Sequence, residues 1–281
     1  MNTAKGASDG VGLVSGPSFT LDDKGLAREY DQISARWQFI AGQVLVEHLA
    51  IKTGERVLDV GCGTGLLAQY IADITGPSGY VLGVDPLPLR IQIAAARARP
   101  GLEFRVGDAY ELHDLRGASF DVVCLNAVFH WLPEKSGPLQ EFARLLKSDG
   151  RLGISSGFGR RRSSLREAAG RVLSQAPFKD YPVPRAGATY EVNQREMSEL
   201  LQAAGFAIAR LEVRQSAREM ASAEDAIRHA EASSFGNFLG HLPEKYRIAA
   251  RELIKRELES LAASEPLREE RDRLIVIGVR Q

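Results

Sequence analysis

A strand, a glycine-rich loop and a helix follow one another between residues 56 and 74, and this unit constrains the fold more than any other segment. Arg56–Val60 is mostly apolar and predicts a buried strand. Gly61, Gly63 and Gly65 come next, and glycines let a backbone turn tightly and approach a ligand closely. In open α/β sheets such a loop places the ligand at the carboxyl edge of the strands, beside a helix N-terminus. We therefore expect an α/β fold with a ligand site at this loop.

The rest of the chain continues the alternation of strands and helices. Apolar runs predict further strands at 80–85, 102–106, 120–126, 151–155, 206–213 and 274–279. Helices are predicted at 66–74, 139–146 and 194–204, and another follows the strand at 80–85 and ends at Arg99. This order predicts a Rossmann-like, seven-stranded, mostly parallel sheet with helices on both faces. Additional helical segments at 1–40 and 216–265 are expected to act as N-terminal and C-terminal lid insertions.

The chain divides into four expected regions. Residues 1–20 are rich in Gly and Ser and predict a disordered tail, and 21–50 predict a helical cap. Residues 51–157 form the ligand-binding core, and 158–281 supply the last two strands together with the lid insertions. An apolar stripe through the cap helix is expected to pack Trp37 into the core, and Gly42 is a candidate break point within that helix.

Composition excludes several classes of function. Lys plus Arg and Asp plus Glu both number 36, so the formal net charge is zero and the chain lacks the overall field that attracts nucleic acid or an anionic membrane. No apolar run approaches the roughly 18 residues of a membrane span. Cys62 and Cys124 lie in apolar surroundings and indicate reduced packing residues of a cytoplasmic protein. The histidines lack the spacing of metal ligands, so we expect no metal.

Asp59 precedes the glycines and defines the kind of ligand. The loop has the spacing G-x-G-x-G, whereas a dinucleotide fingerprint requires G-x-G-x-x-G and would place its third glycine at Leu66. A carboxylate at this point disfavours a pyrophosphate and favours a cationic, amino-acid-like ligand.

Two further acids follow the next strands. Asp85 can accept hydrogen bonds from both hydroxyls of a ribose, and Asp108 can accept one from an adenine amino group.

Five segments together resemble one family. These are Val57–Gly65, the strand ending in Asp85, Gly107-Asp108-Ala109, Ser119–Val123 and Leu145–Gly150. They are similar to the class I S-adenosylmethionine-dependent methyltransferases. Within that family, the chain resembles the small-molecule branch that includes ubiquinone/menaquinone C-methyltransferases and malonyl-carrier-protein methyl ester-forming enzymes. The resemblance covers about residues 50–157, and its motifs concern the cofactor far more than the substrate.

The resemblance implies a role for each residue of the cofactor site. Asp59 and the loop backbone would hold the methionine moiety of S-adenosylmethionine, or of its product S-adenosylhomocysteine. Asp85 would bind the ribose, Asp108 and Ala109 the adenine, and Asn126 would lie beside the sulfonium. The full set of expected cofactor-binding residues is Tyr30, Asp59, Gly61, Cys62, Gly63, Gly65, Asp85, Pro86, Asp108, Ala109 and Asn126. In this set Tyr30 comes from the N-terminal cap and would cover the cofactor.

The acceptor side is less defined. His130 and Trp131 follow the fourth predicted strand, so His130 is the candidate catalytic base and both are candidate substrate-binding residues. A structural histidine is the alternative. Arg160 and Arg161 follow the fifth strand and could clamp an anionic acceptor, with a solvated basic surface as the alternative.

We therefore expect an S-adenosylmethionine-dependent enzyme that methylates O, C or N of a small molecule, with a homodimer as a possible assembly. The alternative from another class is a non-catalytic S-adenosylmethionine-binding protein that regulates or binds a partner. An NAD-dependent oxidoreductase is disfavoured by Leu66. A nucleic-acid methyltransferase is disfavoured by the zero net charge and by Asn126–Phe129, where base methylators often carry Asp/Asn-Pro-Pro-Tyr/Phe.

Overall fold

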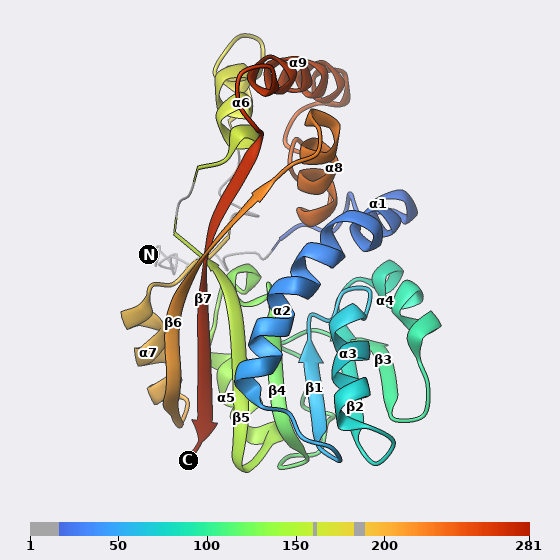
Figure 1. Cartoon of the computed structure of the whole chain (residues 1–281), viewed down its shortest axis with the longest axis vertical. Coiled ribbons are helices and arrows are strands. Elements are labelled where there is room, and N and C mark those ends of the chain that lie inside the picture. Colours follow the sequence, from blue (N-terminus) through green and yellow to red (C-terminus); the bar gives the residue numbers. More distant parts are fainter. Residues whose placement is uncertain (1–16, 160–161, 183–188) are drawn as a thin grey trace, which may run out of the picture.

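The computed structural model describes residues 17–159, 162–182 and 189–281, and within them seven strands form one sheet in the order β3-β2-β1-β4-β5-β7-β6 (Figure 1). The first five strands pair in parallel, and β7 pairs antiparallel with both β5 and β6. The predicted Rossmann-like, mostly parallel sheet is confirmed. The strands are β1 (Arg56–Val60), β2 (Tyr80–Asp85), β3 (Leu102–Val106), β4 (Phe120–Asn126), β5 (Leu146–Phe158), β6 (Phe206–Glu219) and β7 (Arg268–Arg280).

Helices cover both faces of the sheet, and each face has its own apolar core. On one face α2 (Ala35–Leu49) and α3 (Leu66–Thr75) pack on the sheet, and α4 (Pro88–Ala94) lies against β2 and β3. On the other face α5 (Ser136–Leu145) and α7 (Gln194–Ala203) pack around Phe142. The alternation of side chains along each strand explains the two cores, because neighbouring residues such as Val57 and Leu58 enter opposite clusters.

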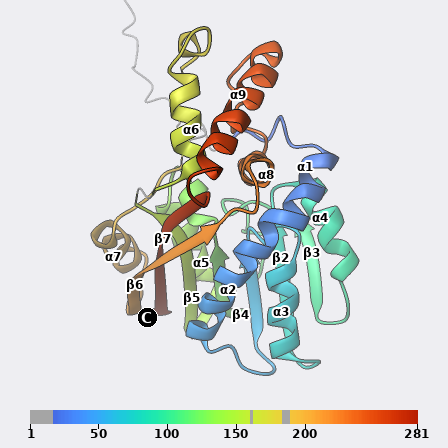
Figure 2. The ribbon, with the colours of Figure 1, turned by 45° about the horizontal axis from the view of Figure 1, so that its top comes forward.

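A second helical cap, separate from the one expected at 21–50, stands beyond the carboxyl ends of the parallel strands (Figures 1 and 2). It consists of α6 (Ser164–Leu173), α8 (Ala223–Ser233) and α9 (Glu244–Ala262), which share a third core around Ile227, Ile254 and Leu258. The long strands β6 and β7 lead from the sheet to this cap. Throughout the described part of the chain, every helix is too short or too polar to cross a membrane.

The N-terminal helix differs from its prediction. It begins as α1 (Lys24–Glu29), passes through a π-helical turn at Tyr30–Ser34 and continues as α2, so the break is not at Gly42. The expected packing of Trp37 is also wrong, since 43% of its side chain is exposed. The cause is Gly42, where a Cβ would lie 2.9 Å from Asn126 Nδ2, so α2 turns this residue and not Trp37 toward the sheet.

The two last strands extend further than their apolar runs predict. Residues 216–219, expected in a helical insertion, continue β6, which pairs with β7 from Phe206 opposite Arg280 to Glu219 opposite Arg268. The side chains there are polar, but pairing with β7 satisfies the backbone N–H and C=O groups, and this favours a strand over a loop. The rest of the helical segment predicted at 216–265 is divided into α8 and α9 by a turn with positive φ at Phe235 and Gly236.

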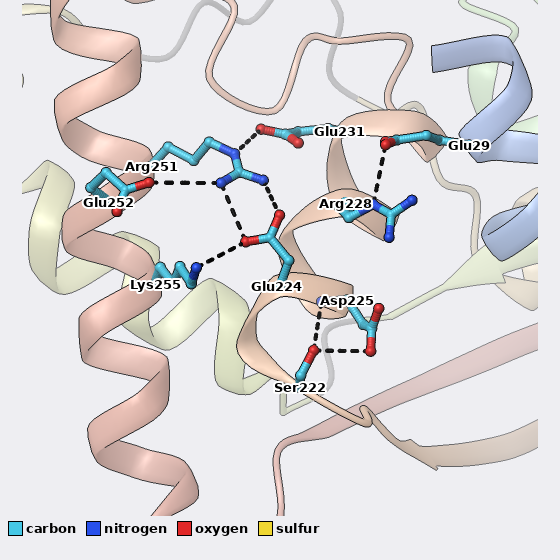
Figure 3. Close-up of polar contacts among 9 residues, drawn as sticks. All are labelled: Glu29, Ser222, Glu224, Asp225, Arg228, Glu231, Arg251, Glu252 and Lys255. Atoms are coloured by element: carbon cyan, nitrogen blue, oxygen red, sulfur yellow. Dashed lines mark hydrogen bonds and ion pairs between the residues drawn. The ribbon is translucent and has the colours of Figure 1, made fainter. Parts of the chain in front are cut away.

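Ion pairs tie the cap together (Figure 3). Arg251 of α9 lies between two carboxylates of α8, pairing with Glu224 and donating from Nε to Glu231 Oε1 at 3.1 Å. Arg228 of α8 pairs with Glu29 of α1 at 3.1 Å. The helix α8 is thus the central element of the cap, and it connects α9 to the N-terminal helix.

We expect Arg251→Gln to lower the free energy of unfolding by about 1–2 kcal/mol, because two partly buried carboxylates lose a shared, charged donor. Arg195→Gln is the matched control. Its guanidinium pairs with Glu199 one helical turn away on an exposed surface, so its loss should be about 0.5 kcal/mol or less. Urea unfolding of both variants checks this, and equal losses would show that the Arg251 network does not stabilise the cap.

Candidate active site

The glycine loop between β1 and α3 is held close to the end of β4. Gly61 has a φ of +73°, and a Cβ added there would lie 2.2 Å from Val128 Cγ2. Gly63 is covered by Tyr30, whose hydroxyl would lie 2.9 Å from such a Cβ. The predicted need for glycine at these two positions is therefore steric as well as conformational. Gly65 packs against Phe104 and Ala94, so it serves the turn into α3.

Asp85 joins the glycine loop to the end of β2. Its Oδ2 accepts a hydrogen bond from the Gly63 N–H at 2.9 Å, and its Oδ1 accepts one from the Leu87 N–H at 3.0 Å. The side chain is buried, and burial raises the pKa of Asp85 although the nearby Arg90 guanidinium opposes this rise. Each carboxylate oxygen keeps a lone pair for a further donor, as contact with a ribose requires.

A cavity of about 340 Å³ lies in front of this carboxylate. Asp108, at the end of β3, accepts a hydrogen bond from the Tyr110 N–H at 2.9 Å, and its side chain lines the cavity. The structure thus brings together, at one edge of the sheet, residues predicted from four separate strand ends. The predicted residues that line the cavity are Tyr30, Gly61, Asp85, Pro86, Asp108, Ala109, Asn126 and Trp131.

A narrow recess adjoins this cavity, with Tyr30, Gly61 and Asn126 in both walls. Three buried oxygens lining the recess, Asp59 Oδ2, Thr64 Oγ1 and Asn126 Oδ1, have no hydrogen-bond partner among the described residues. Buried polar atoms without partners are rare and mark places where a ligand or ion donates. The recess therefore suits a compact group with several N–H donors, such as an ammonium.

The carboxyl group of Asp59 is tuned by burial. Its Oδ1 accepts a weak hydrogen bond from the Cys124 thiol at 3.6 Å, and burial raises the pKa of Asp59 to about 7. A cation placed in the recess would favour the ionised form of this group. Both cysteines are free thiols, as predicted, and Cys62 also lines the recess.

Tyr30, Arg90 and Phe235 form the cover of the cavity. The guanidinium of Arg90 lies 3.7 Å from the ring centroid of Tyr30 and 4.8 Å from that of Phe235, and it donates to the Ala232 carbonyl at 3.1 Å. The Tyr30 hydroxyl donates to Gln38 Oε1 at 2.6 Å. Burial raises the pKa of Tyr30 to about 12, so the hydroxyl keeps its proton. Tyr30 therefore lies at this cavity, and its predicted contact with the cofactor stays a prediction.

A second cavity of about 280 Å³ lies beside the first. The two share Gln38, Ala127, Trp131 and Ser233 as lining residues, and His130 lines only the second. His130 is buried, and burial together with the charges of Arg271 and Arg273 holds its pKa well below the usual value.

The hydrogen bonds of His130 fix the form of its ring. Its Nδ1 accepts from the Gly157 N–H at 3.3 Å and lies 3.1 Å from the Ser156 hydroxyl. A nitrogen that accepts from a backbone N–H carries no proton, so the neutral ring has its proton on Nε2. In this form the ring offers a donor, whereas the base predicted from the sequence would need an accessible lone pair.

Several residues of the site escaped prediction. Thr64 lies within the glycine motif and could have been proposed from its position, but Gln38, Arg90 and Phe235 carry no sequence signal of their own. They reach the site only because α2, α4 and the turn after α8 meet there. Arg160 and Arg161 lie outside the described residues. Among the described residues, no group of histidine, cysteine or acidic side chains has the arrangement of a metal site.

Comparison with known proteins identifies the class of the core. Residues 58–154 match the sequence model described as a methyltransferase domain. Together with the sheet order and the site at Asp59, Asp85 and Asp108, this match confirms the predicted resemblance. The core is a class I S-adenosylmethionine-dependent methyltransferase domain.

Two curated relatives and one solved structure show how far the likeness extends. The chain is 34% identical over 111 residues to a demethylmenaquinone methyltransferase of Lactobacillus johnsonii, covering 38% of this chain and 45% of that protein. It is 33% identical over 131 residues to an aklanonic acid methyltransferase of Streptomyces sp. strain C5, covering 45% and 59%. A putative methyltransferase of Bacillus halodurans shares the fold with a TM-score of 0.56 and 16% identity, covering 85% of this chain and 98% of that one.

The chain thus spans about half the length of the curated relatives it matches. The matched domain ends at residue 154, before α6, α8 and α9 begin. The cap that borders the second cavity therefore lies outside the matched domain.

We expect Asp59→Asn to weaken binding of S-adenosylhomocysteine in a pH-dependent manner. With a pKa of about 7, Asp59 is protonated at low pH and ionised at high pH, and only the ionised form attracts an ammonium. The dissociation constants of variant and wild type should be similar near pH 6 and differ about tenfold near pH 8. Calorimetry at both pH values measures this ratio. Asp121→Asn, at the opposite end of β4, is the control, and a pH-independent ratio for Asp59→Asn would contradict the assignment.

Proposed function

We propose that this chain transfers a methyl group from S-adenosylmethionine to a small-molecule acceptor. The observation that carries the proposal is the pair of adjoining cavities, with the cofactor residues around the first and the cap around the second. Gln38, Ala127 and Trp131 line both cavities, and this supports transfer of the methyl group where the two meet. Matches to a quinone methyltransferase and a natural-product methyltransferase support an acceptor of metabolite size.

The residues present fit the cofactor. Asp59 Oδ2 and Asn126 Oδ1 have no hydrogen-bond partner among the described residues. Asp59 would accept from the ammonium of the cofactor, Asn126 would lie near its sulfonium, and Asp85 would accept from its ribose hydroxyls. Asp108 and the Ala109 backbone would bind the adenine. The sulfonium supplies an activated methyl group, so the protein need only position the acceptor and exclude water. Tyr30, Arg90 and Phe235, which line the cavity, would help to exclude water from it.

We further propose that His130 orients the acceptor by donating a hydrogen bond from Nε2. A buried, neutral ring whose Nδ1 is already occupied by the Gly157 N–H suits this task better than proton abstraction. The ring centroids of Trp131 and His130 lie 5.2 Å apart. Trp131 would pack against the acceptor at the junction of the cavities. The absence of nucleic acid as a substrate, a homodimer and a cytoplasmic location stay predictions.

The first test is the binding of the cofactor. We expect S-adenosylhomocysteine to bind the wild-type protein and NAD not to bind. Asp85→Asn should raise the dissociation constant of S-adenosylhomocysteine by about 10–100-fold, because charge-assisted bonds to two hydroxyls become weaker. Asp114→Asn, an exposed acid on the surface, is the matched control. Tighter binding of NAD, or equal affinities in the two variants, would overturn the assignment.

The second test concerns His130. Long-range ¹H–¹⁵N spectra of the imidazole should show protonated Nε2 and unprotonated Nδ1, unchanged between about pH 5 and pH 8, because the buried ring resists protonation. Signals missing from His130→Gln identify the ring. A cationic ring at pH 6, or a proton on Nδ1, would restore the general base as the better account.

A further inference from the structure

A group of arginines lies on the strands that lead to the cap. Arg214 and Arg218 of β6 and Arg271 and Arg273 of β7 belong to the stretch where these strands pair, with Arg214 opposite Arg273. Alternation along β7 places Arg271 and Arg273 on the same face as Ile275, which packs in the core beneath α2. The register of the two strands therefore gathers arginines that are far apart in the sequence.

These arginines border the second cavity and a neighbouring one. Arg218 and Arg271 line both of them, along with Glu269 and His229. Arg218 also stacks over Trp37, with its guanidinium carbon 5.2 Å from the ring centroid. The arginines lining one or both cavities are Arg166, Arg214, Arg218, Arg268, Arg271 and Arg273, whereas Glu269 is the one acidic residue described in either lining.

Within the described residues these positive charges are offset only in part, by Glu269, which lies opposite Arg218 and whose charge acts on it. No ion pair there joins Arg218, Arg271 or Arg273 to a carboxylate, and Arg273 donates only to the Ser155 hydroxyl at 3.3 Å. Glu269 accepts a hydrogen bond from the Ser163 hydroxyl at 2.7 Å. In a chain with equal numbers of acidic and basic residues, this local excess requires an explanation.

The effect of these charges is visible in the neighbouring groups. Burial lowers the pKa of Arg273 to about 10, and the charges of Arg271 and Arg218 add to this. Burial lowers the pKa of His229 to about 3, again with contributions from Arg218 and Arg271. An anion placed among the arginines would stabilise the charged form of each of these groups.

We propose that the acceptor carries an anionic group, a carboxylate or a phosphate, that binds Arg218 and Arg271 as an anchor. The inference rests on the proposed function. Gln38, Ala127 and Trp131 line both the cofactor cavity and the second cavity, whereas Arg218 and Arg271 line only the second of these two. The anchored group is therefore distinct from the atom that receives the methyl group. Guanidinium groups suit this task because they bind carboxylate and phosphate oxygens in pairs.

Three small probes of similar size test the anchor. They are 3-phenylpropionate, phenyl phosphate and the neutral 3-phenylpropan-1-ol, titrated by calorimetry and ligand-observed NMR with and without S-adenosylhomocysteine. At least one anion should bind about tenfold or more tightly than the alcohol, and the tighter anion identifies the group. Neither anion should displace S-adenosylhomocysteine. An alcohol that binds as tightly as both anions, or displacement of the cofactor product by the anions, would overturn the anchor.

Paired variants isolate the two arginines. The double variant Arg218→Gln/Arg271→Gln should lose the preference for the anion, whereas Arg218→Lys/Arg271→Lys should keep part of it and show that the fold is intact. Arg116→Gln/Arg195→Gln removes the same charge from exposed positions and should leave the preference unchanged. Equal loss in this control would attribute the effect to net charge and contradict the proposal. If anions bind but S-adenosylhomocysteine does not, the anchor stands and the proposed methyl transfer fails.

Discussion

The carboxylate of Asp85 accepts hydrogen bonds from the backbone N–H groups of Gly63 and Leu87, and most of the site depends on this arrangement. The two bonds hold the glycine loop of one strand against the end of the next. They also compensate part of the cost of burying the carboxylate beside a cavity. With the loop fixed in this way, Asp59 and Asn126 line a recess and each keep an oxygen that no group in the described part of the chain satisfies. The protein thus holds in place a set of hydrogen-bond acceptors that a cationic ligand can satisfy.

The acceptor side is formed by other elements of the fold. The helices α6, α8 and α9 share one apolar core, the ion pairs of Arg251 join α9 to α8, and that of Arg228 joins α8 to α1. The strands β6 and β7 continue from the sheet into this cap, so the arginines they carry are fixed relative to the cofactor cavity (Figure 2). The proposed anchor residues Arg218 and Arg271 lie beyond the matched domain, whereas Asp59, Asp85, Asp108 and Asn126 lie within it.

The sequence was informative where local patterns coincide with the fold. Apolar runs ending in glycine or aspartate predicted β1, β2 and the positions of Asp59 and Asp85, because each run is buried on both faces of a parallel sheet. Trp37 was misplaced because the rotation of α2 is set by the fit of Gly42 against Asn126, a contact between distant segments. The sequence predicted that His130 would face the acceptor, but not that the Gly157 N–H would occupy its Nδ1.

The arginines of β6 and β7 could not be grouped from the sequence for the same reason. Arg218 and Arg271 are separated by the whole of α8 and α9, and only the antiparallel register brings them to one cavity. Residues 214–219 are mostly polar or charged and residues 268–273 are all charged, so neither stretch contains an apolar run and the strands there were predicted too short.

The most direct test of this account is a crystal structure of the protein with S-adenosylhomocysteine. The account predicts the ligand's ammonium within hydrogen-bond distance of Asp59 Oδ2, its ribose hydroxyls on Asp85 and its sulfur facing the junction at Ala127 and Trp131. A ligand bound elsewhere, or one that leaves Asp59 Oδ2 without a partner, would contradict it.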